Sequence, residues 1–409
     1  MSTETAQGAD AARRHERRIL IWMCVLIAAN QLGFGGVVPV LPLYAQSFGV
    51  TAAAIGLAVA VYGLARVVVA MPSGRLSDWF GRRPTLALGG LVSAIGNLWC
   101  GYADTYPEFI LARFVAGLGA GLVLTTGQVV LADITTPERR GRTMAIYQGV
   151  FIFAVGIGPL PGGWIAEHYG LAAPFQAYAI AGAIAGLVAW FAVAETRDLA
   201  TATRGQAHAR KMPFSSQLRA LTQSVGYLLA GAISFANAFA RTGALFAIVP
   251  VLGAVRLGLS PTQIGLGLAL GSIAGLAATF PVGVLLDRYG RKSVIVPATI
   301  GAGVSMLLFL FAPSHGWFIG ACLTWGVAAA AGGAAPAAYA ADSAPPGLNA
   351  AAMSTFRMIG DLGYVIGPIT LGAIVDSYSS EASLGVAAAL LIGVGILFGV
   401  LAPETHRAR

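Results

Sequence analysis

The segment Gly74-Arg-Leu-Ser-Asp78-Trp-Phe-Gly81-Arg82-Arg83-Pro joins two apolar stretches, at 52–73 and 84–104. A similar segment, Gly283-Val-Leu-Leu-Asp287-Arg-Tyr-Gly290-Arg291-Lys292, begins 209 residues later. In each segment a glycine permits a sharp reversal of the chain, and an acidic residue lies near basic ones. One such segment would indicate only a tight turn that carries charge. Two segments in matching places indicate that the chain contains a repeated unit.

The composition places this repeat in a membrane. Of 409 residues, 57% are hydrophobic and only 10% are charged, too few charges to cover the surface of a soluble protein. Stretches of about 20 apolar residues, the length that crosses a bilayer, recur along the chain. The net charge of +8 lies in loops on one side, which argues against nucleic acid as a partner. The three cysteines fall in apolar stretches and show neither disulfide nor zinc spacing, so we expect no metal and no cofactor.

Three further sites repeat at the same offset of 209 residues. They pair Ala132, Asp133 and Pro137 with Ala341, Asp342 and Pro346; Gly158, Pro159 and Gly163 with Gly367, Pro368 and Gly372; and Glu195 and Thr196 with Glu404 and Thr405. One constant offset at four separated places is hard to obtain by chance. Because each repeat holds an even number of apolar stretches, the two halves are expected to share one orientation about an axis along the membrane normal.

The apolar stretches predict an all-α membrane protein with twelve transmembrane helices in two pseudo-symmetric six-helix bundles, because only helices satisfy their own backbone in lipid. The expected spans are 19–46, 52–73, 84–104, 107–133, 141–165, 174–194, 222–251, 261–282, 293–312, 316–341, 352–375 and 382–402. The expected domains are a cytoplasmic tail at 1–18, a first bundle at 19–195, a cytoplasmic linker at 196–221, a second bundle at 222–402 and a cytoplasmic tail at 403–409.

The basic residues predict the orientation. With the N-terminus inside, 20 of the 25 Lys and Arg residues fall in cytoplasmic segments. The others are Arg256 in an external loop and Arg66, Arg113, Arg241 and Arg357 inside spans. Both termini are therefore expected on the cytoplasmic side of a bacterial inner membrane, in a chain that works as a monomer.

The repeated segment resembles the loop signature of the major facilitator superfamily. The resemblance implies two rocking halves and a latch at the cytoplasmic ends of the helices in the outward-open state, with Arg82 paired to Asp133. The gating-loop residues are then Gly74, Asp78, Gly81, Arg82 and Asp133 in the first half, and Gly283, Asp287, Gly290 and Arg291 in the second. The second half has no charges that match those between Glu138 and Arg142, so its latch is expected to be weaker.

Three other segments resemble motifs of the twelve-span drug:proton antiporters. They are Leu32-Gly33-Phe-Gly-Gly-Val-Val-Pro39-Val-Leu-Pro42, Arg113-Phe-Val-Ala-Gly117-Leu-Gly119-Ala-Gly121 and Gly158-Pro159-Leu-Pro-Gly162-Gly163. The resemblance implies proton-coupled efflux. Two departures weaken it: Ala145 and Ala154 replace expected glycines, and the uncharged Asn30 and Gln31 stand where such antiporters often carry an acid.

Charged residues inside spans are functional candidates, because a charge in the bilayer costs about 3 kcal/mol or more. Asp361 is the acid that lies well inside a span, and Arg357 precedes it by one helical turn. Asp361 is either a proton-coupling carboxylate influenced by Arg357, or half of an ion pair that makes a helix–helix contact. Arg113, in its motif, is the third candidate for coupling.

Polar and aromatic residues near the middle of spans are candidates for the substrate cavity. They are Asn30, Gln31, Phe34, Tyr62, Gln148, Asn237, Arg241, Trp325 and Tyr364. Most aromatic residues in such a bundle only pack or face lipid. As a group, however, these residues suit an amphiphilic organic solute better than an inorganic ion.

The sequence therefore favours a secondary active transporter that exports small amphiphilic, drug-like compounds in exchange for protons. The alternative is uptake or facilitated transport of an organic metabolite, including an anionic one, on the same fold. A membrane scaffold is disfavoured, because a scaffold needs no doubled gating loop. An enzyme is disfavoured too, because the chain shows no nucleotide loop, metal cluster or nucleophile constellation.

Overall fold

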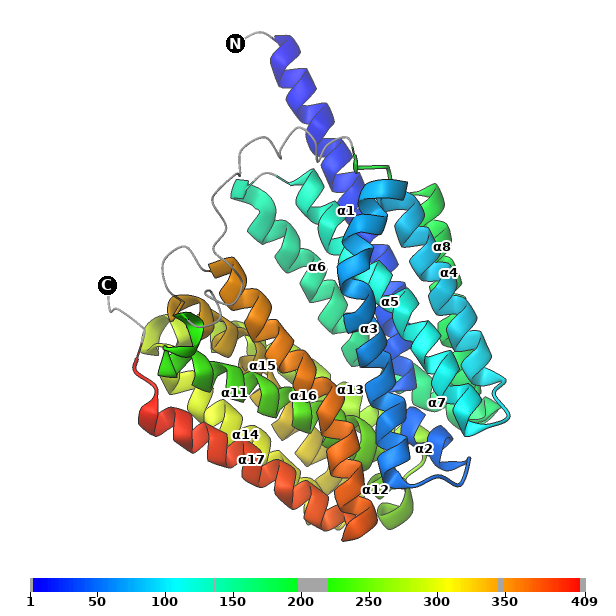
Figure 1. Ribbon diagram of the computed structural model, residues 1–409, viewed down its shortest axis with the longest axis vertical. Coiled ribbons are helices and arrows are strands. Elements are labelled where there is room, and N and C mark those ends of the chain that lie inside the picture. The colour runs from blue at the N-terminus through cyan, green and yellow to red at the C-terminus, as the bar shows by residue number, and fades with distance from the viewer. Residues whose placement is uncertain (1–2, 136, 198–219, 345–348, 405–409) are drawn as a thin grey trace. The chain divides into compact units, whose positions relative to one another are not determined.

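The computed structural model describes residues 3–135, 137–197, 220–344 and 349–404 (Figure 1). In that part of the chain every regular element is a helix, and 11 helices are long and apolar enough to cross a membrane. The prediction of an all-α, multi-pass membrane protein is confirmed. The expected span at 84–104 is helix α4 (Arg82–Gly101), which is less apolar than those 11. The count of twelve spans and the two-bundle arrangement stay predictions.

The chain folds as two compact units. The first unit comprises Met1–Val37, Leu64–Gly158 and Ala172–Ala209. Its helices are α1 (Thr3–Val37), the second part of α3 (Ala52–Phe80), α4, α5 (Tyr106–Ile134), α6 (Pro137–Ile157) and α8 (Ala173–Phe191). Helix α4 packs against both α5 and α8. Small residues permit this close approach, since a Cβ on Gly96 would meet Ala116 and one on Gly90 would meet Gly186.

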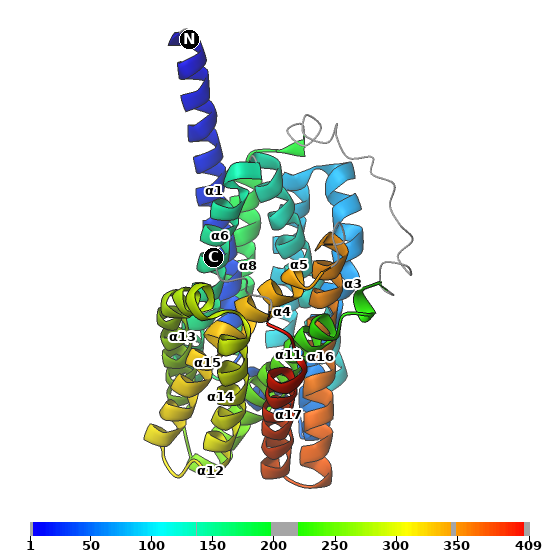
Figure 2. The same ribbon diagram turned by 90° about the vertical axis from the view of Figure 1, so that its left-hand side faces the viewer.

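The second unit comprises Val38–Gly63, Pro159–Leu171 and Arg210–Arg409. Its helices are α2 (Leu41–Gln46), the first part of α3, α7 (Pro159–Tyr169), α11 (Val225–Phe239), η2 (Ala240–Ile248), α12 (Val249–Leu257), α13 (Pro261–Tyr289), α14 (Lys292–Leu310), α15 (His315–Asp342), α16 (Asn349–Ser377) and α17 (Ser380–Leu401). Helices α14 and α17 run side by side (Figures 1 and 2). The second unit thus contains two pieces of the first half of the sequence.

Three expected spans are irregular helices. The span at 19–46 divides at Val38-Pro39-Val40 into α1 and α2, and the span at 141–165 divides at Gly158 into α6 and α7. Pro159 has no N–H to donate and a ring that crowds the preceding turn, which explains the second break. The seventh span is continuous from α11 through η2 to α12, and η2 is a π-helix.

The sequence repeat reappears as a packing repeat within the second unit. A Cβ on Gly56 would meet the carbonyl of Pro368, and a Cβ on Gly265 would meet the carbonyl of Pro159. The glycines are 209 residues apart, and so are the prolines. A first-half and a second-half helix are therefore in close contact at two equivalent places.

Replacing Gly326 with valine is expected to destabilise the second unit by about 2 kcal/mol, because overpacking forces closely packed helices apart. A Cβ at Gly326 of α15 would collide with the carbonyl oxygen of Gly271 of α13. Thermal unfolding in detergent measures the effect. Gly320→Val is the matched control on the same helix, since a Cβ there meets nothing within 4 Å. Equal melting temperatures for the two variants would contradict the prediction.

Candidate functional site

A single glycine connects α3 and α4 in the first charged loop. Helix α3 ends at Phe80 and α4 begins at Arg82, so Gly81 alone reverses the chain. Its φ of 99° lies in the region that L side chains rarely adopt. A Cβ there would also lie 2.5 Å from Oε2 of Glu195. The position therefore requires glycine for two independent reasons.

The guanidinium of Arg82 is buried and bridges two helix ends. Its Nε donates to Oδ2 of Asp133 at 2.9 Å, and its Nη1 donates to Oδ1 of Asp78 at 2.7 Å. Nη1 also donates to the carbonyl of Ser77 at 2.8 Å, and the side chain is 1% exposed. Two carboxylates and a carbonyl compensate the cost of burying this charge. The Arg82–Asp133 pair that the resemblance implies is present.

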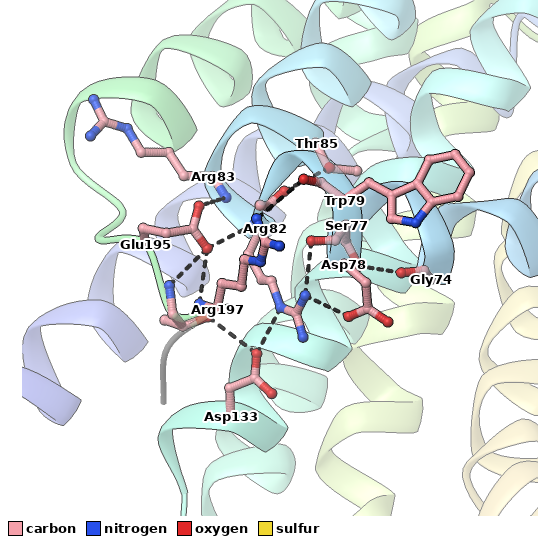
Figure 3. Close-up of polar contacts among 12 residues, drawn as sticks. Gly74, Ser77, Asp78, Trp79, Arg82, Arg83, Thr85, Asp133, Glu195 and Arg197 are labelled. Carbon is pink, nitrogen blue, oxygen red and sulfur yellow. Dashed lines mark hydrogen bonds and ion pairs between the residues drawn. The ribbon is translucent and has the colours of Figure 1, made fainter. Parts of the chain in front are cut away.

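Glu195 completes this network from the segment that follows α8 (Figure 3). Its Oε1 accepts the backbone N–H of Arg82 at 2.9 Å, and its Oε2 accepts that of Arg83 at 3.1 Å. These N–H groups lie in the first turn of α4, where no helical partner exists and where the helix dipole favours an anion. The sequence interpretation did not include Glu195 in the site. The repeated Glu195-Thr196 dipeptide was the signal that pointed to it.

These contacts of the first loop lie within the first half of the sequence. Asp78, Asp133 and Glu195 all belong to the first unit, as does Arg82. The network therefore fixes the ends of α3, α4, α5 and α8 relative to one another. The latch between halves that the resemblance implies stays a prediction.

The second charged loop repeats the arrangement more loosely. Gly290 has a φ of 90°, and Nε of Arg291 donates to Oδ2 of Asp342 at 3.3 Å. Glu404 accepts the backbone N–H groups of Arg291 and Lys292 at 3.2 and 3.3 Å. The Arg291 side chain is 24% exposed, against 1% for Arg82.

The pair in this loop is longer and more exposed to solvent than the Arg82–Asp133 pair. The weaker second latch stays a prediction. Two of the predicted gating-loop glycines, Gly74 and Gly283, have open space where a Cβ would point, so their packing does not require glycine. The side chains of Asp287 and of 138–142 lie outside the described part of the structure.

Replacing Glu195 with alanine is expected to cost about 1 kcal/mol, the usual effect of losing a cap at a helix N-terminus. The unfolding midpoint of the purified protein in detergent checks this. Glu404→Ala removes the equivalent cap in the second half, where the bonds are longer, and should cost less. A larger loss for Glu404→Ala than for Glu195→Ala would refute this ordering.

The coupling candidates lie in different environments. Asp361 is half-buried on α16 and Arg357 is exposed one turn earlier, and no ion pair joins the two in the described chain. The ion pair considered as the alternative role for Asp361 is therefore not formed in this structure. Arg113 is 1% exposed on α5, within the first unit.

Four cavity candidates belong to the first unit. Asn30 is fully buried on α1, and its Oδ1 accepts the hydroxyl of Tyr178 of α8 at 3.2 Å. Its Nδ2 has no hydrogen-bond partner among the described residues. Gln31 is 3% exposed, Phe34 is half-buried and Gln148 is exposed. A buried amide with an unused donor is a polar group that a ligand or water could satisfy.

The other five cavity candidates belong to the second unit. Asn237 of α11 faces α15, where a Cβ on Gly332 would lie 3.3 Å from its Oδ1; Trp325 is on α15 and is 7% exposed. Tyr364 packs its ring on Gly63, next to the buried Tyr62. Arg241 is exposed at the start of η2. A single cavity lined by all nine candidates stays a prediction.

The π-helix η2 was not predicted from the sequence. Such helices are rare and occur often at functional sites. The hydroxyl of Thr242 donates to the carbonyl of Ala238 at 2.9 Å and lies 3.1 Å from that of Tyr364, which ties η2 to α16. Gly243 packs against Gly367 beside it. No group of three or more metal-ligating side chains occurs in the part of the chain that the structure describes.

Comparisons with known proteins agree with this architecture. A family model described as Major Facilitator Superfamily matches residues 23–260 and 230–409. An uncharacterized MFS-type transporter of Methanocaldococcus jannaschii is 24% identical over 92% of this chain and 96% of its own length. Multidrug resistance protein 2 of Bacillus subtilis is 25% identical over 68% of this chain and 70% of its own. The structure of the nucleoside transporter NupG is similar with a TM-score of 0.77, at 14% identity, over 93% of this chain and 98% of that one.

Proposed function

Because this chain belongs to the Major Facilitator Superfamily, we propose that it exports small amphiphilic compounds, drug-like molecules among them, by proton-coupled alternating access. Members of this family are transporters and not enzymes, so the chain transports a small molecule across the membrane in which it lies. The observation that carries the export proposal is the likeness to relatives named as multidrug resistance proteins, in Bacillus subtilis and in Klebsiella pneumoniae.

The structure supports a two-state mechanism through the charged loops. Arg82 with Asp78, Asp133 and Glu195 fixes four helix ends of the first half as one rigid cluster. A rigid cluster at the loop end allows that half to move as a body. We place this end at the cytoplasmic face of a bacterial inner membrane, because Lys and Arg concentrate in these loops and in the tails. Contact of each loop with the opposite half would then bias the equilibrium between the two states.

We assign proton coupling to Asp361. It is the acid well inside a span, and its half-buried position on α16 would let it exchange its proton with whichever side is open. A carboxylate that is neutral in one state and charged in the other links proton movement to the change of state. Arg357, one turn away, would stabilise the charged form. Arg113 is a further coupling candidate that would act through its fixed positive charge, because a guanidinium stays protonated.

The candidate residues indicate the chemical class of the substrate. Asn30 and Gln31 are uncharged, and the aromatic rings of Tyr62, Trp325 and Tyr364 offer apolar surface with hydroxyl or N–H groups. Such a mixture suits an amphiphilic molecule. Arg241, exposed on η2, favours the alternative of an anionic metabolite as solute.

A cell assay tests the direction of transport. The chain is expressed in a bacterial strain that lacks its own drug exporters, and ethidium and a fluoroquinolone serve as probes. We expect lower accumulation of a probe than with empty vector, and loss of the difference when an uncoupler collapses the proton gradient. Accumulation that is equal or higher for both probes would reject drug export.

A further inference from the structure

Two carboxylates in the second unit join the two halves of the sequence. The first is Asp376, near the end of α16. Its Oδ1 accepts the backbone N–H of Ala52 at 2.7 Å, and its Oδ2 accepts that of Ala53 at 2.8 Å. These two residues begin α3, so Asp376 of the second half caps a helix of the first half.

The second carboxylate is Glu167, near the end of α7. Its Oε2 accepts the hydroxyl of Ser260 at 2.8 Å and the backbone N–H of Thr262 at 3.3 Å. Ser260 is the N-cap of α13, and Thr262 lies in its first turn. Here an acid of the first half caps a helix of the second half.

The two contacts are equivalent under the sequence repeat. Glu167 and Asp376 are 209 residues apart, and so are Ala53 and Thr262. The donors differ at one position, because Pro261, the counterpart of Ala52, has no N–H to donate. The hydroxyl of Ser260 supplies the second hydrogen bond instead. Both acids thus keep two donors although the residues that provide them differ.

Both contacts lie at the helix ends farthest from the charged loops. Helix α3 runs from its capped residue, Ala52, to Phe80 beside the first loop, and α13 runs from Pro261 to Tyr289 beside the second. We call these capped ends the distal ends. Glycines let the backbones meet there, since a Cβ on Gly163 would collide with the carbonyl of Pro261 and one on Gly372 with that of Ala52.

A carboxylate stabilises a helix N-terminus for an electrostatic reason. The first N–H groups of a helix have no partner within the helix, and the dipole makes this end positive. If the halves separate at the distal ends, two helix N-termini and two carboxylates lose their partners together. Water then replaces four charge-assisted hydrogen bonds, so each contact favours the joined state.

We propose that Glu167 and Asp376 form a reciprocal latch that closes the distal ends of the transporter, in which each half provides one carboxylate and one helix N-terminus. The proposal rests on alternating access, the two-state mechanism proposed above. It assigns to the distal ends a closing device built from helix caps and not from ion pairs. Because there are two such contacts, the carboxylate of each half binds a helix N-terminus of the other half.

Distances between spin labels across the latch test the proposal. In a background without the three native cysteines, one label pair is placed at Gln46 and Tyr378 and another at Tyr169 and Val255, all exposed and each pair divided between the halves. Purified protein without substrate should show mainly a short distance. Asp376→Asn and Glu167→Gln should each raise the ratio of long to short distances about three- to tenfold, and the double variant by about the product.

Two further variants sharpen this experiment. Glu381→Gln is the matched control, since Glu381 is exposed and its nearest ion-pair contact, Arg256 at 3.9 Å, belongs to the same half; it should change neither distance distribution. Ala52→Pro removes one donor to Asp376 and keeps every charge, and proline already occupies the matching position 261. It should shift the Gln46–Tyr378 distances in the same direction as Asp376→Asn, but less.

Distances that stay unchanged in Asp376→Asn and Glu167→Gln, as in Glu381→Gln, would overturn the latch. If a neutral variant fails to fold, the label distances in Ala52→Pro test the latch instead. Transport is assayed separately with ethidium. If the distances shift but the protein does not export ethidium, the latch is retained and the proposed function is rejected. If the protein exports ethidium but the distances do not change, the proposed function is retained and the latch is rejected.

Discussion

Arg82→Ala is expected to abolish most transport and to destabilise the first unit by about 3 kcal/mol. The substitution leaves Asp133, whose side chain is 9% exposed, and Asp78 without the cation that both bind. An uncompensated carboxylate at a buried helix end is among the costliest single changes in a protein. Thermal unfolding in detergent measures the loss of stability. Dye export in cells, corrected for the amount of protein in the membrane, should fall about tenfold or more.

Two other arginines serve as controls for this prediction. Arg75 lies in the last turns of α3, near the same connection, with an exposed side chain, so Arg75→Ala should leave stability close to that of the unmodified protein. Arg291→Ala breaks the looser pair with Asp342 and should cost about 1 kcal/mol, as expected for a partly exposed pair. If Arg82→Ala and Arg75→Ala were equally stable, the buried cluster would not organise the first half.

Asp361→Asn is expected to uncouple transport from the proton gradient. Asparagine preserves the shape of the side chain but cannot bind and release a proton. Accumulation driven by a pH gradient should therefore fall about tenfold or more, while exchange of labelled for unlabelled solute at equal pH persists. Reconstituted protein in liposomes measures both activities on one preparation.

A matched substitution separates coupling from packing. Asp376→Asn neutralises an acid at the end of the same helix, and it should alter the ratio of open to closed distal ends without removing coupling. Full gradient-driven transport by Asp361→Asn would exclude Asp361 as the coupling site. Arg113→Gln would then be the next variant to measure.

The repeat allowed the fold class and the charged loops to be predicted from the sequence. Its constant offset marked Asp133 and Asp342 before any contact was known, and the Arg82–Asp133 pair is present in the structure. The resemblance supplied the pairing itself, because spacing alone does not show which acid meets a given arginine. Apolar length and composition predicted helices, since lipid allows little else.

Other features could not be predicted, because backbone groups create them. Glu195, Glu167 and Asp376 bind N–H groups at helix starts, and a backbone donor leaves no mark in the sequence. The spacing of 209 residues between Glu167 and Asp376 was a sequence signal for these contacts. It was missed because the two residues are not identical and belong to none of the repeated motifs. The π-helix at Ala240–Ile248 depends on contacts with α16 that local sequence does not encode.

The compact units follow contacts in space and not the order of the sequence. The expected linker at 196–221 divides the sequence into halves, whereas the compact units place Val38–Gly63 and Pro159–Leu171 in the second unit. Close helix contacts at Gly56, Gly163, Gly265 and Gly372 cause this assignment. In the proposed transport cycle, contacts between the halves follow the state of the molecule and not its sequence order.

Transport across an imposed pH gradient by the purified protein in liposomes tests the central claim most directly. With ethidium as the probe and the interior made acidic, we predict that the dye accumulates above its external concentration and that a protonophore removes this excess, with protein-free liposomes as the baseline. Dye that only equilibrates across the membrane, at the same rate with and without the gradient, would contradict proton-coupled transport and favour a facilitator.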